Sequence, residues 1–271
     1  MDSEVVYEEC LAKTILVKSG IYDVDYTVNP YFGCAHGCIY CYARFMFIRR
    51  NLDPNNWGKY VCAKINAPKL LRNEIKKHKR GIVLLSSVTD PYQPIERKYQ
   101  LTRQILKIFL QHKYPVVILT KSDMVLRDID ILKKFEQIEV GLTITTLNTE
   151  DAKYFEPRAT SPDKRLRALE ELSKYVDTYA FIGPYLPFIS DKTIEDLMIS
   201  IKEIGVKRII FDKLNLKSRN WETIYEGLRN YDENIKRAFR KKANDNNYWL
   251  RIKKKIMYLS SKYKIPVSYC Y

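Results

Sequence analysis

The chain has 271 residues, 46% of them hydrophobic, and a formal net charge of +15 at pH 7. This size and composition suit a single globular domain with a full core, residues 1–271. No run of about 18 apolar residues is present, which argues against a membrane-spanning helix and a membrane partner. Residues 1–4 lack the basic and apolar parts of a signal peptide, so we expect a cytoplasmic, reducing location.

Short apolar runs alternate with helical patterns along the chain. The runs that we predict to be strands are Tyr26–Asn29, Ile82–Leu85, Val116–Leu119, Val140–Ile144, Tyr179–Ile182 and Ile209–Phe211. Such runs are typical of strands buried on both faces of a parallel sheet. The alternating order predicts an α/β fold of six strand–helix units, an open or partial barrel.

The helical patterns carry their own start signals. Thr102 is a candidate cap for the apolar face at 105–110, and Ser161 followed by Pro162 is a cap with proline at the first helical position. Asp191 precedes another apolar face at 194–204. An apolar stripe at 249–263 predicts a last helix.

The loop after the first predicted strand holds Cys34, Cys38 and Cys41, spaced C-x3-C-x2-C and interrupted by glycines. Three thiolates on one loop can hold three irons of a cubic [4Fe–4S] cluster and leave the fourth iron open. A structural zinc site stays an alternative, but it needs a fourth ligand from His36, Cys10, Cys62 or Cys270. A disulfide framework, or unligated buried thiols, are the remaining alternatives.

Polar residues follow the later predicted strands. The clusters are 86–90, 120–123, 145–148, 183–185 and 212–215. Turn chemistry explains any one of them. Barrel enzymes, however, build their sites at the C-terminal ends of strands, so we favour one shared site together with the cysteine loop.

The region 236–255 is strongly basic, with only Asp245 opposing, and aromatic residues are interleaved. Cations with aromatics are typical of single-strand nucleic-acid binders. The spacing of Trp249, Ile252 and Ile256 favours packing on the core instead, with the cations on a solvated face. The charge indicates a polyanion, above all DNA or RNA, or simply a lysine-rich composition.

Longer strings carry a family resemblance. The cysteine spacing with an aromatic before the last cysteine resembles the radical S-adenosylmethionine (radical SAM) signature, and the string NPYFGCAHGCIYCYARF resembles the spore photoproduct lyase-like branch. The strings 88–96, 119–123 and 211–215 agree with that branch. The resemblance implies a partial (β/α)6 TIM-like barrel with its core at about 19–218, and we expect a basic helical extension at 219–271.

The resemblance also implies the cofactors and their ligands. A [4Fe–4S] cluster would sit on the three cysteines and S-adenosylmethionine on its open iron. One electron from a reductant such as ferredoxin or flavodoxin would then yield a 5′-deoxyadenosyl radical, which takes hydrogen from a substrate. Tyr40 would pack near the adenine, and Thr89 and Asp90 would contact the cofactor's amino group.

Three further positions follow from the same resemblance. Lys121 would pair with the cofactor carboxylate, although an exposed surface lysine stays open. Thr145 would contact the ribose. Tyr42 matches a tyrosine for which a radical relay is suggested in the lyase, and it is the candidate catalytic residue.

One position departs from the lyase pattern. The lyase returns hydrogen from a cysteine where this chain has Ser87. A serine O–H bond is too strong for that step, which argues against repair by that route. Cys62 or Cys270 stay open as other donors. We therefore expect a radical SAM enzyme, lyase-like or transferase-like, with nucleic acid as the leading substrate. The alternatives are a peptide or small-molecule substrate, or a non-catalytic, metal-stabilised nucleic-acid-binding protein.

Overall fold

The structure is a computed structural model, and it describes residues 4–216 and 219–270. The strands in these ranges are β1 (Val6–Cys10), β2 (Leu16–Lys18), β3 (Tyr26–Val28), β4 (Tyr31–Phe32), β5 (Tyr60–Lys64), β6 (Val83–Leu85), β7 (Val116–Thr120), β8 (Ile138–Thr143), β9 (Asp177–Tyr185), β10 (Arg208–Lys213) and β11 (Val267–Tyr269). The α-helices are α1 (Phe45–Arg49), α2 (Ala67–Glu74), α3 (Glu96–Tyr99), α4 (Leu101–Gln111), α5 (Ile129–Leu132), α6 (Thr149–Phe155), α7 (Pro162–Ser173), α8 (Ile194–Ile204), α9 (Trp221–Gly227), α10 (Glu233–Ala243) and α11 (Asn246–Tyr263). The predictions that concern residues 1–3 and the boundary at 218 fall outside the described residues.

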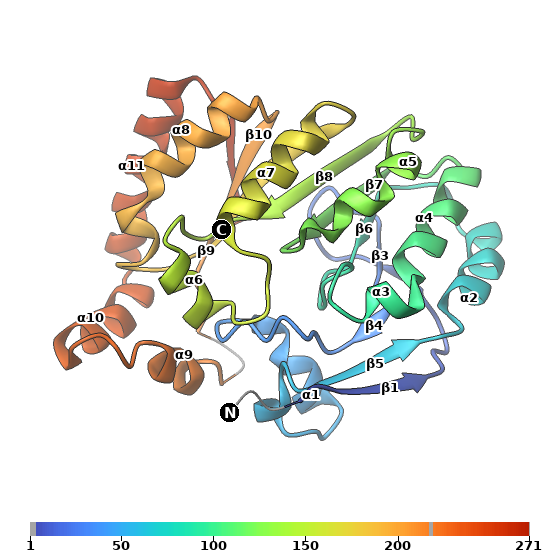
Figure 1. The fold of residues 1–271 in the computed structure, drawn as a ribbon, viewed down its shortest axis with the longest axis horizontal. Coiled ribbons are helices and arrows are strands. Elements are labelled where there is room, and N and C mark those ends of the chain that lie inside the picture. The colour runs from blue at the N-terminus through green and yellow to red at the C-terminus, as the bar shows by residue number, and fades with distance from the viewer. Residues whose placement is uncertain (1–3, 217–218, 271) are drawn as a thin grey trace.

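The main sheet has the strand order β11-β10-β9-β8-β7-β6-β3-β2 (Figure 1). All six predicted strands are present, and from β3 to β10 each pairs in parallel with its neighbour. The sheet is extended at both edges, by β11 in parallel with β10 and by β2 antiparallel to β3. The prediction of a parallel α/β fold is therefore confirmed.

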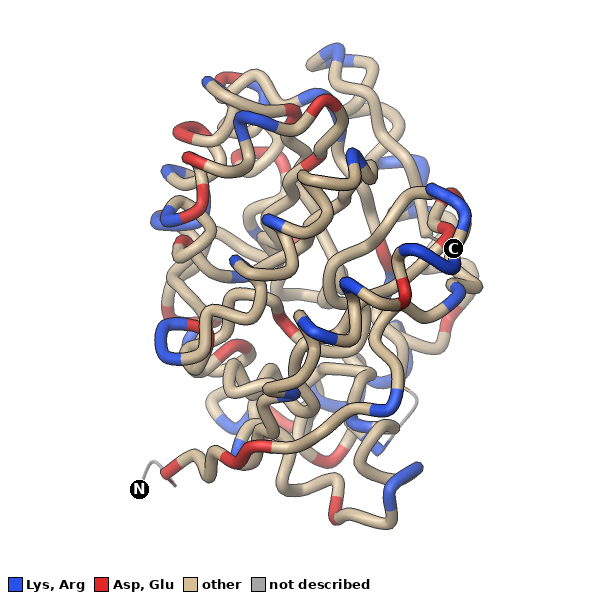
Figure 2. The backbone as a smooth tube through the Cα atoms, turned by 90° about the vertical axis from the view of Figure 1, so that its right-hand side faces the viewer, with Lys and Arg blue, Asp and Glu red and all other residues tan. Residues whose placement is uncertain are grey.

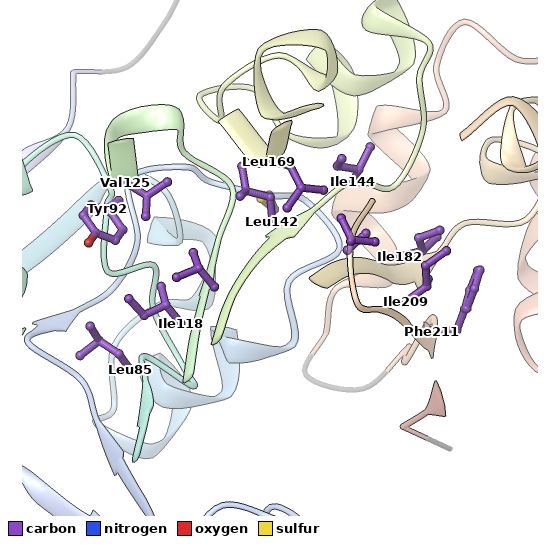
Figure 3. Close-up of a cluster of buried hydrophobic side chains, with 14 of the residues drawn as sticks. Leu85, Tyr92, Ile118, Val125, Leu142, Ile144, Leu169, Ile182, Ile209 and Phe211 are labelled. Carbon is purple, nitrogen blue, oxygen red and sulfur yellow. The ribbon is translucent and has the colours of Figure 1, made fainter. Parts of the chain in front are cut away.

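The core lies between one face of this sheet and the helices that cover it (Figure 3). Leu85, Ile118 and Ile182 lie on the face that the helices cover, and their side chains are fully buried. Their strand neighbours Val117 and Phe181 are only partly buried. The predicted burial on both faces is complete along β8 from Val140 to Thr143 and only partial at these two positions.

A second, three-stranded sheet with the order β1-β5-β4 was not predicted. A disulfide between Cys10 and Cys62 joins β1 to β5. β4 pairs with β5 immediately before the cysteine loop. This small sheet therefore fixes the point at which that loop begins.

The helices follow the predicted faces with one error at a helix start. Thr102 is not the cap of α4, since the helix begins at Leu101 and the Thr102 hydroxyl donates to the Pro91 carbonyl over 2.6 Å. Ser161 does occupy the cap position of α7, with Pro162 following. The C-terminal part is helical, and in α11 Trp249 and Ile256 are buried, as the apolar stripe predicts.

The surface of the molecule mixes charges of both signs. Lys and Arg lie among Asp and Glu in the view of Figure 2, which shows the tube from the side opposite α10. Among the described residues, no helix has the length and apolar character to cross a bilayer.

Candidate active site at the cysteine loop

The loop that carries the three cysteines depends on glycine at both of its bends. Gly33 has φ +77°, and a Cβ there would lie 2.3 Å from the Tyr60 carbonyl oxygen. Gly37 has φ +63° and approaches Gly58 so closely that a Cβ on Gly58 would lie 2.7 Å from the Gly37 Cα. Positive φ and backbone contact together admit only glycine at these positions without a shift.

Three other segments, at residues 89–93, 155 and 220–223, hold the loop by hydrogen bonds to its backbone. The Ala35 amide donates to Gln93 Oε1 (2.8 Å), and the Ile39 amide donates to the Phe155 carbonyl (3.0 Å). Further bonds run from Thr89 Oγ1 to the Gly33 carbonyl (2.5 Å), from Asn220 Nδ2 to the Tyr40 carbonyl (2.9 Å) and from Thr223 Oγ1 to the Ile39 carbonyl (2.8 Å). The loop is thus a rigid, preorganised element.

All three thiols of the loop are sheltered from solvent. Cys34 and Cys38 are each 6% exposed, and Cys41 is partly buried. Burial raises the pKa of all three, for Cys38 to about 12, so the metal-free thiols are neutral at pH 7. A bound metal cation would favour the thiolates.

The loop offers three free thiols on one short segment, which is the ligand type that iron–sulfur clusters use. Within the described ranges, no three sulfur, imidazole or carboxylate groups converge on one ion position. Of the candidate fourth zinc ligands, Cys10 and Cys62 are bonded to each other, and His36 Nδ1 lies 3.4 Å from Asp90 Oδ2.

Asp90 is buried and connects the cysteine loop to the end of β7. Its carboxylate accepts from Thr120 Oγ1 (2.7 Å) and from the Lys121 amide (2.8 Å). Burial alone would raise the pKa of Asp90, but the contact with His36 and these hydrogen bonds hold it below its usual value. Asp90 is therefore an anion at neutral pH, as a contact for an amino group requires.

Tyr40 is held by a buried ion pair that the sequence did not reveal. Its hydroxyl donates to the Glu156 carboxylate, which also pairs with the Arg165 guanidinium. Thr145 Oγ1 donates to the same carboxylate over 3.1 Å, and Lys121 Nζ lies 5.6 Å from the centre of the Tyr40 ring. Three of the residues assigned to the cofactor by resemblance, Tyr40, Lys121 and Thr145, therefore surround one carboxylate.

Tyr42 and Ser87 also meet. The Tyr42 hydroxyl donates to the Ser87 carbonyl, and the Tyr42 side chain is 48% exposed. Cys62, left open as a hydrogen donor, is bonded to Cys10 and is not a free thiol here. Cys270 is a free thiol at the end of β11.

Glu156 and Arg165 are the main omissions of the sequence analysis. One signal was present, because Arg165 falls on the buried face of α7 with Ala168, Leu169 and Leu172. A cation on an apolar helix face is almost never buried without a partner. Its partner Glu156 lies nine residues earlier, and no feature of the sequence around Glu156 indicates that its carboxylate is buried.

A family comparison covers the part of the chain that carries this loop. The model described as "Radical SAM superfamily" matches residues 28–201, which include the whole cysteine loop and strands β6 to β9. The chain belongs to the radical SAM superfamily.

Relatives of this radical SAM protein span most of its length. An uncharacterized protein of Methanocaldococcus jannaschii is 40% identical over 235 residues, 86% of each chain. A protein of Pseudomonas phage M6 named "Radical SAM Nalpha-GlyT isomerase" is 25% identical over 186 residues, 67% of this chain and 38% of that protein.

Solved structures share the fold at low identity. A mutant of spore photoproduct lyase superposes with a TM-score of 0.73 and 14% identity, covering 98% of this chain and 82% of that chain. A second lyase mutant, with bound AdoMet and dinucleoside spore photoproduct, has a TM-score of 0.72, 12% identity and the same coverage. The predicted resemblance to the spore photoproduct lyase-like branch is confirmed at the level of the fold.

Proposed function

We propose that this protein is a radical SAM enzyme that carries a [4Fe–4S] cluster on Cys34, Cys38 and Cys41. The observation that supports it most is the sheltered three-thiol loop beside Asp90, Tyr40 and Lys121. When bound, the cluster and S-adenosylmethionine would together supply a 5′-deoxyadenosyl radical that abstracts hydrogen from the substrate. The protein's own share is to bind, orient and exclude water.

We assign the binding roles as follows. Tyr40 would pack against the adenine, and its tie to Glu156 fixes the ring. Asp90 and Thr89 would accept from the cofactor's amino group, although the Thr89 hydroxyl already donates to Gly33. Lys121 would pair with the cofactor carboxylate. Thr145 would accept from the ribose through Oγ1, because its proton is used on Glu156.

Nucleic acid is the substrate class that we favour. A structural neighbour, spore photoproduct lyase, has been solved in complex with dinucleoside spore photoproduct. The net charge of +15 suits a polyanionic substrate. Because Ser87 stands where the lyase has its hydrogen-donating cysteine, we do not propose the lyase's own repair reaction. The exposed Tyr42, tied to the Ser87 backbone, is the candidate catalytic residue.

Two further points complete the proposal. The electron would come from a low-potential carrier such as ferredoxin or flavodoxin. The enzyme would work in the cytoplasm, where the cluster is protected from oxidation.

The decisive experiment is an anaerobic cleavage assay. The protein is reconstituted with iron and sulfide, reduced with dithionite and mixed with S-adenosylmethionine, with and without DNA or RNA oligomers. We expect 5′-deoxyadenosine from the wild type and none from Cys38→Ala. The matched control is Cys270→Ala, which removes a thiol outside the loop and should retain product.

Metal analysis decides between the enzyme and a binding module. Iron with sulfide, about four of each per chain, agrees with a [4Fe–4S] cluster. Zinc in place of iron, or product that Cys38→Ala retains, would overturn the proposal. Product that rises with a peptide and not with oligonucleotides would favour the peptide alternative.

A further inference from the structure

A groove of about 510 Å³ lies between α9 and α10, outside the candidate active site. It is strongly cationic, with one carboxylate among its walls. Its lining residues are Trp221, Tyr225, Glu233, Lys236, Arg237, Arg240, Lys241 and Asn244. None of these takes part in the site described above.

Most of the positive charge in this groove is uncompensated. Lys236 pairs with Glu233 at 2.7 Å. Within the described part of the chain, Arg237 and Lys241 make no ion pair and are exposed. They stand four residues apart on α10, so they project from the same side of that helix. The groove therefore offers a pair of solvent-facing cations on one side of α10.

Helix α9 separates this groove from the cysteine loop. Asn220 and Thr223 donate to the loop carbonyls of Tyr40 and Ile39, and a Cβ on Gly227 would lie 2.1 Å from Ile39 Cδ1. Trp221 and Tyr225 project from the opposite side of the helix, since each residue turns the helix by about 100°. The groove thus lies roughly one helix diameter, about 10 Å, from the loop backbone beside Cys38 and Cys41.

We propose that this groove docks an acidic one-electron carrier protein of the flavodoxin or ferredoxin class. The inference rests on the proposed function, because it supplies the electron which that function needs. The reduced carrier would lose one electron, and the cluster behind α9 would gain it. No bond is made or broken, and no proton is transferred. Complementary charge would steer the encounter and fix the orientation of the carrier.

The aromatic rings of the groove argue for a protein partner over a nucleic acid. Single-strand binders need open aromatic faces on which bases stack. Here the Arg240 guanidinium lies 5.1 Å from the centre of the Trp221 ring, and Lys236 Nζ lies 4.9 Å from that of Tyr225. Trp221 also packs against Phe239, at 6.3 Å between centroids. Trp, Tyr and Arg in this arrangement are typical of protein interface centres.

The groove also lies away from the substrate's own path. Under the proposed function, a substrate carbon would come to the cofactor beside Tyr40 and Lys121, which lie in contact with each other. The groove is on the far side of α9 from that loop. It therefore suits a partner that delivers an electron and never meets the radical.

The test uses the charge reversal Arg237→Glu with Lys241→Glu in the reconstituted full chain. The matched control is Lys254→Glu with Lys255→Glu, two exposed residues of α11 that change the net charge by the same amount. The first readout is binding of an oxidised, acidic flavodoxin by calorimetry at 50 mM salt. We expect the groove variant to bind at least tenfold more weakly and the control to bind within twofold of wild type.

The second readout compares two reductants. With reduced flavodoxin, 5′-deoxyadenosine formation by the groove variant should fall at least tenfold, whereas with dithionite it should match wild type. Equal flavodoxin binding by both variants, or no binding by wild type, overturns the docking site. Loss of oligothymidylate binding with unchanged flavodoxin binding would make it a nucleic-acid groove. Absence of product from wild type with dithionite would instead contradict the proposed function and leave the binding result intact.

Discussion

The Glu156 carboxylate is the meeting point of the cysteine loop, the end of β8 and α7. It receives the Tyr40 hydroxyl, the Thr145 hydroxyl and the Arg165 guanidinium, and it is 2% exposed. Burial alone would raise the pKa of Glu156, but Arg165 and then Lys121 hold it below its usual value. A buried ion pair contributes little net stability, yet the loss of one partner leaves a charge without compensation. We infer that the pair serves to orient Tyr40.

Replacing Arg165 by methionine should therefore be strongly destabilising. We expect Arg165→Met to lower the free energy of unfolding by about 3–5 kcal/mol, because Glu156 would keep a buried, unpaired charge. Urea denaturation of the metal-free protein under anaerobic conditions measures the change.

Two variants check the cause of that loss. Arg167→Met removes an exposed arginine from the same helix and should change stability by less than about 0.5 kcal/mol. The double variant Arg165→Met with Glu156→Gln should recover much of the loss. If the double variant is less stable than the single one, uncompensated charge is not the reason.

At the residue scale, the sequence predicted which side chains are candidates for a site better than it predicted which side chains contact one another. The three cysteines could be singled out as candidate ligands from their spacing alone, because they lie on one loop and are local in sequence. The Glu156–Arg165 ion pair and the hydrogen bond from Asn220 to the Tyr40 carbonyl could not be predicted, because each depends on how separate segments pack. Thr102 was misread as a cap for a similar reason, since its hydroxyl partner is the carbonyl of Pro91.

Among the elements, the cysteine loop depends most on backbone conformation. Gly33 combines φ +77° with a carbonyl 2.3 Å from the place of a Cβ, whereas Gly205, at φ +79°, has nothing within 4 Å. Comparing the two glycines therefore distinguishes the cost of a positive φ from the cost of a steric clash at the Cβ position. Alanine at Gly205 should lower the free energy of unfolding by only about 1 kcal/mol, the cost of a positive φ in a residue with a Cβ.

We therefore expect Gly33→Ala to lose most of the iron that the wild type takes up on anaerobic reconstitution. The displaced backbone would shift Cys34 relative to the other two thiols. Gly205→Ala should incorporate iron at the wild-type level, with a small fall in melting temperature. Iron and sulfide analysis measures the effect, and full incorporation by Gly33→Ala would contradict the role of this bend.

The six central strands could be predicted because each is an apolar run that packs on helices. The small sheet could not. β1 is largely exposed and acidic at Glu8 and Glu9, so it has no apolar pattern. Its pairing with β5 joins residues more than fifty positions apart, such as Cys10 and Lys64. Turn signals between neighbouring strands give no information on such a pairing.

For the whole molecule, the net charge of +15 makes a quantitative prediction about the proposed nucleic-acid substrate. We expect the affinity for a single-stranded DNA 12-mer to fall at least tenfold between 50 and 200 mM salt. For single strands, the slope of log K against log salt concentration is about −0.7 for each phosphate that the protein neutralises. A tenfold fall over this range therefore corresponds to about two to three neutralised phosphates. Fluorescence anisotropy measures it.

The matched control for this prediction is a 12-mer with an uncharged methylphosphonate backbone, which should bind weakly and show little salt dependence. The groove variant Arg237→Glu with Lys241→Glu should keep the wild-type slope. An affinity for the charged 12-mer that does not change with salt would argue that the surplus of lysine is compositional.

The contacts between α9 and the cysteine loop also set an order of events during synthesis. The loop carbonyls of Tyr40 and Ile39 receive hydrogen bonds from residues 180 and 184 positions later in the chain. At roughly 5–20 residues per second, a ribosome needs about ten to forty seconds to make the intervening chain. During that time the thiols have left the ribosome while the helix that covers them does not yet exist. If the loop carries the proposed cluster, iron would consequently be delivered to the finished loop as one of the last steps in making this protein.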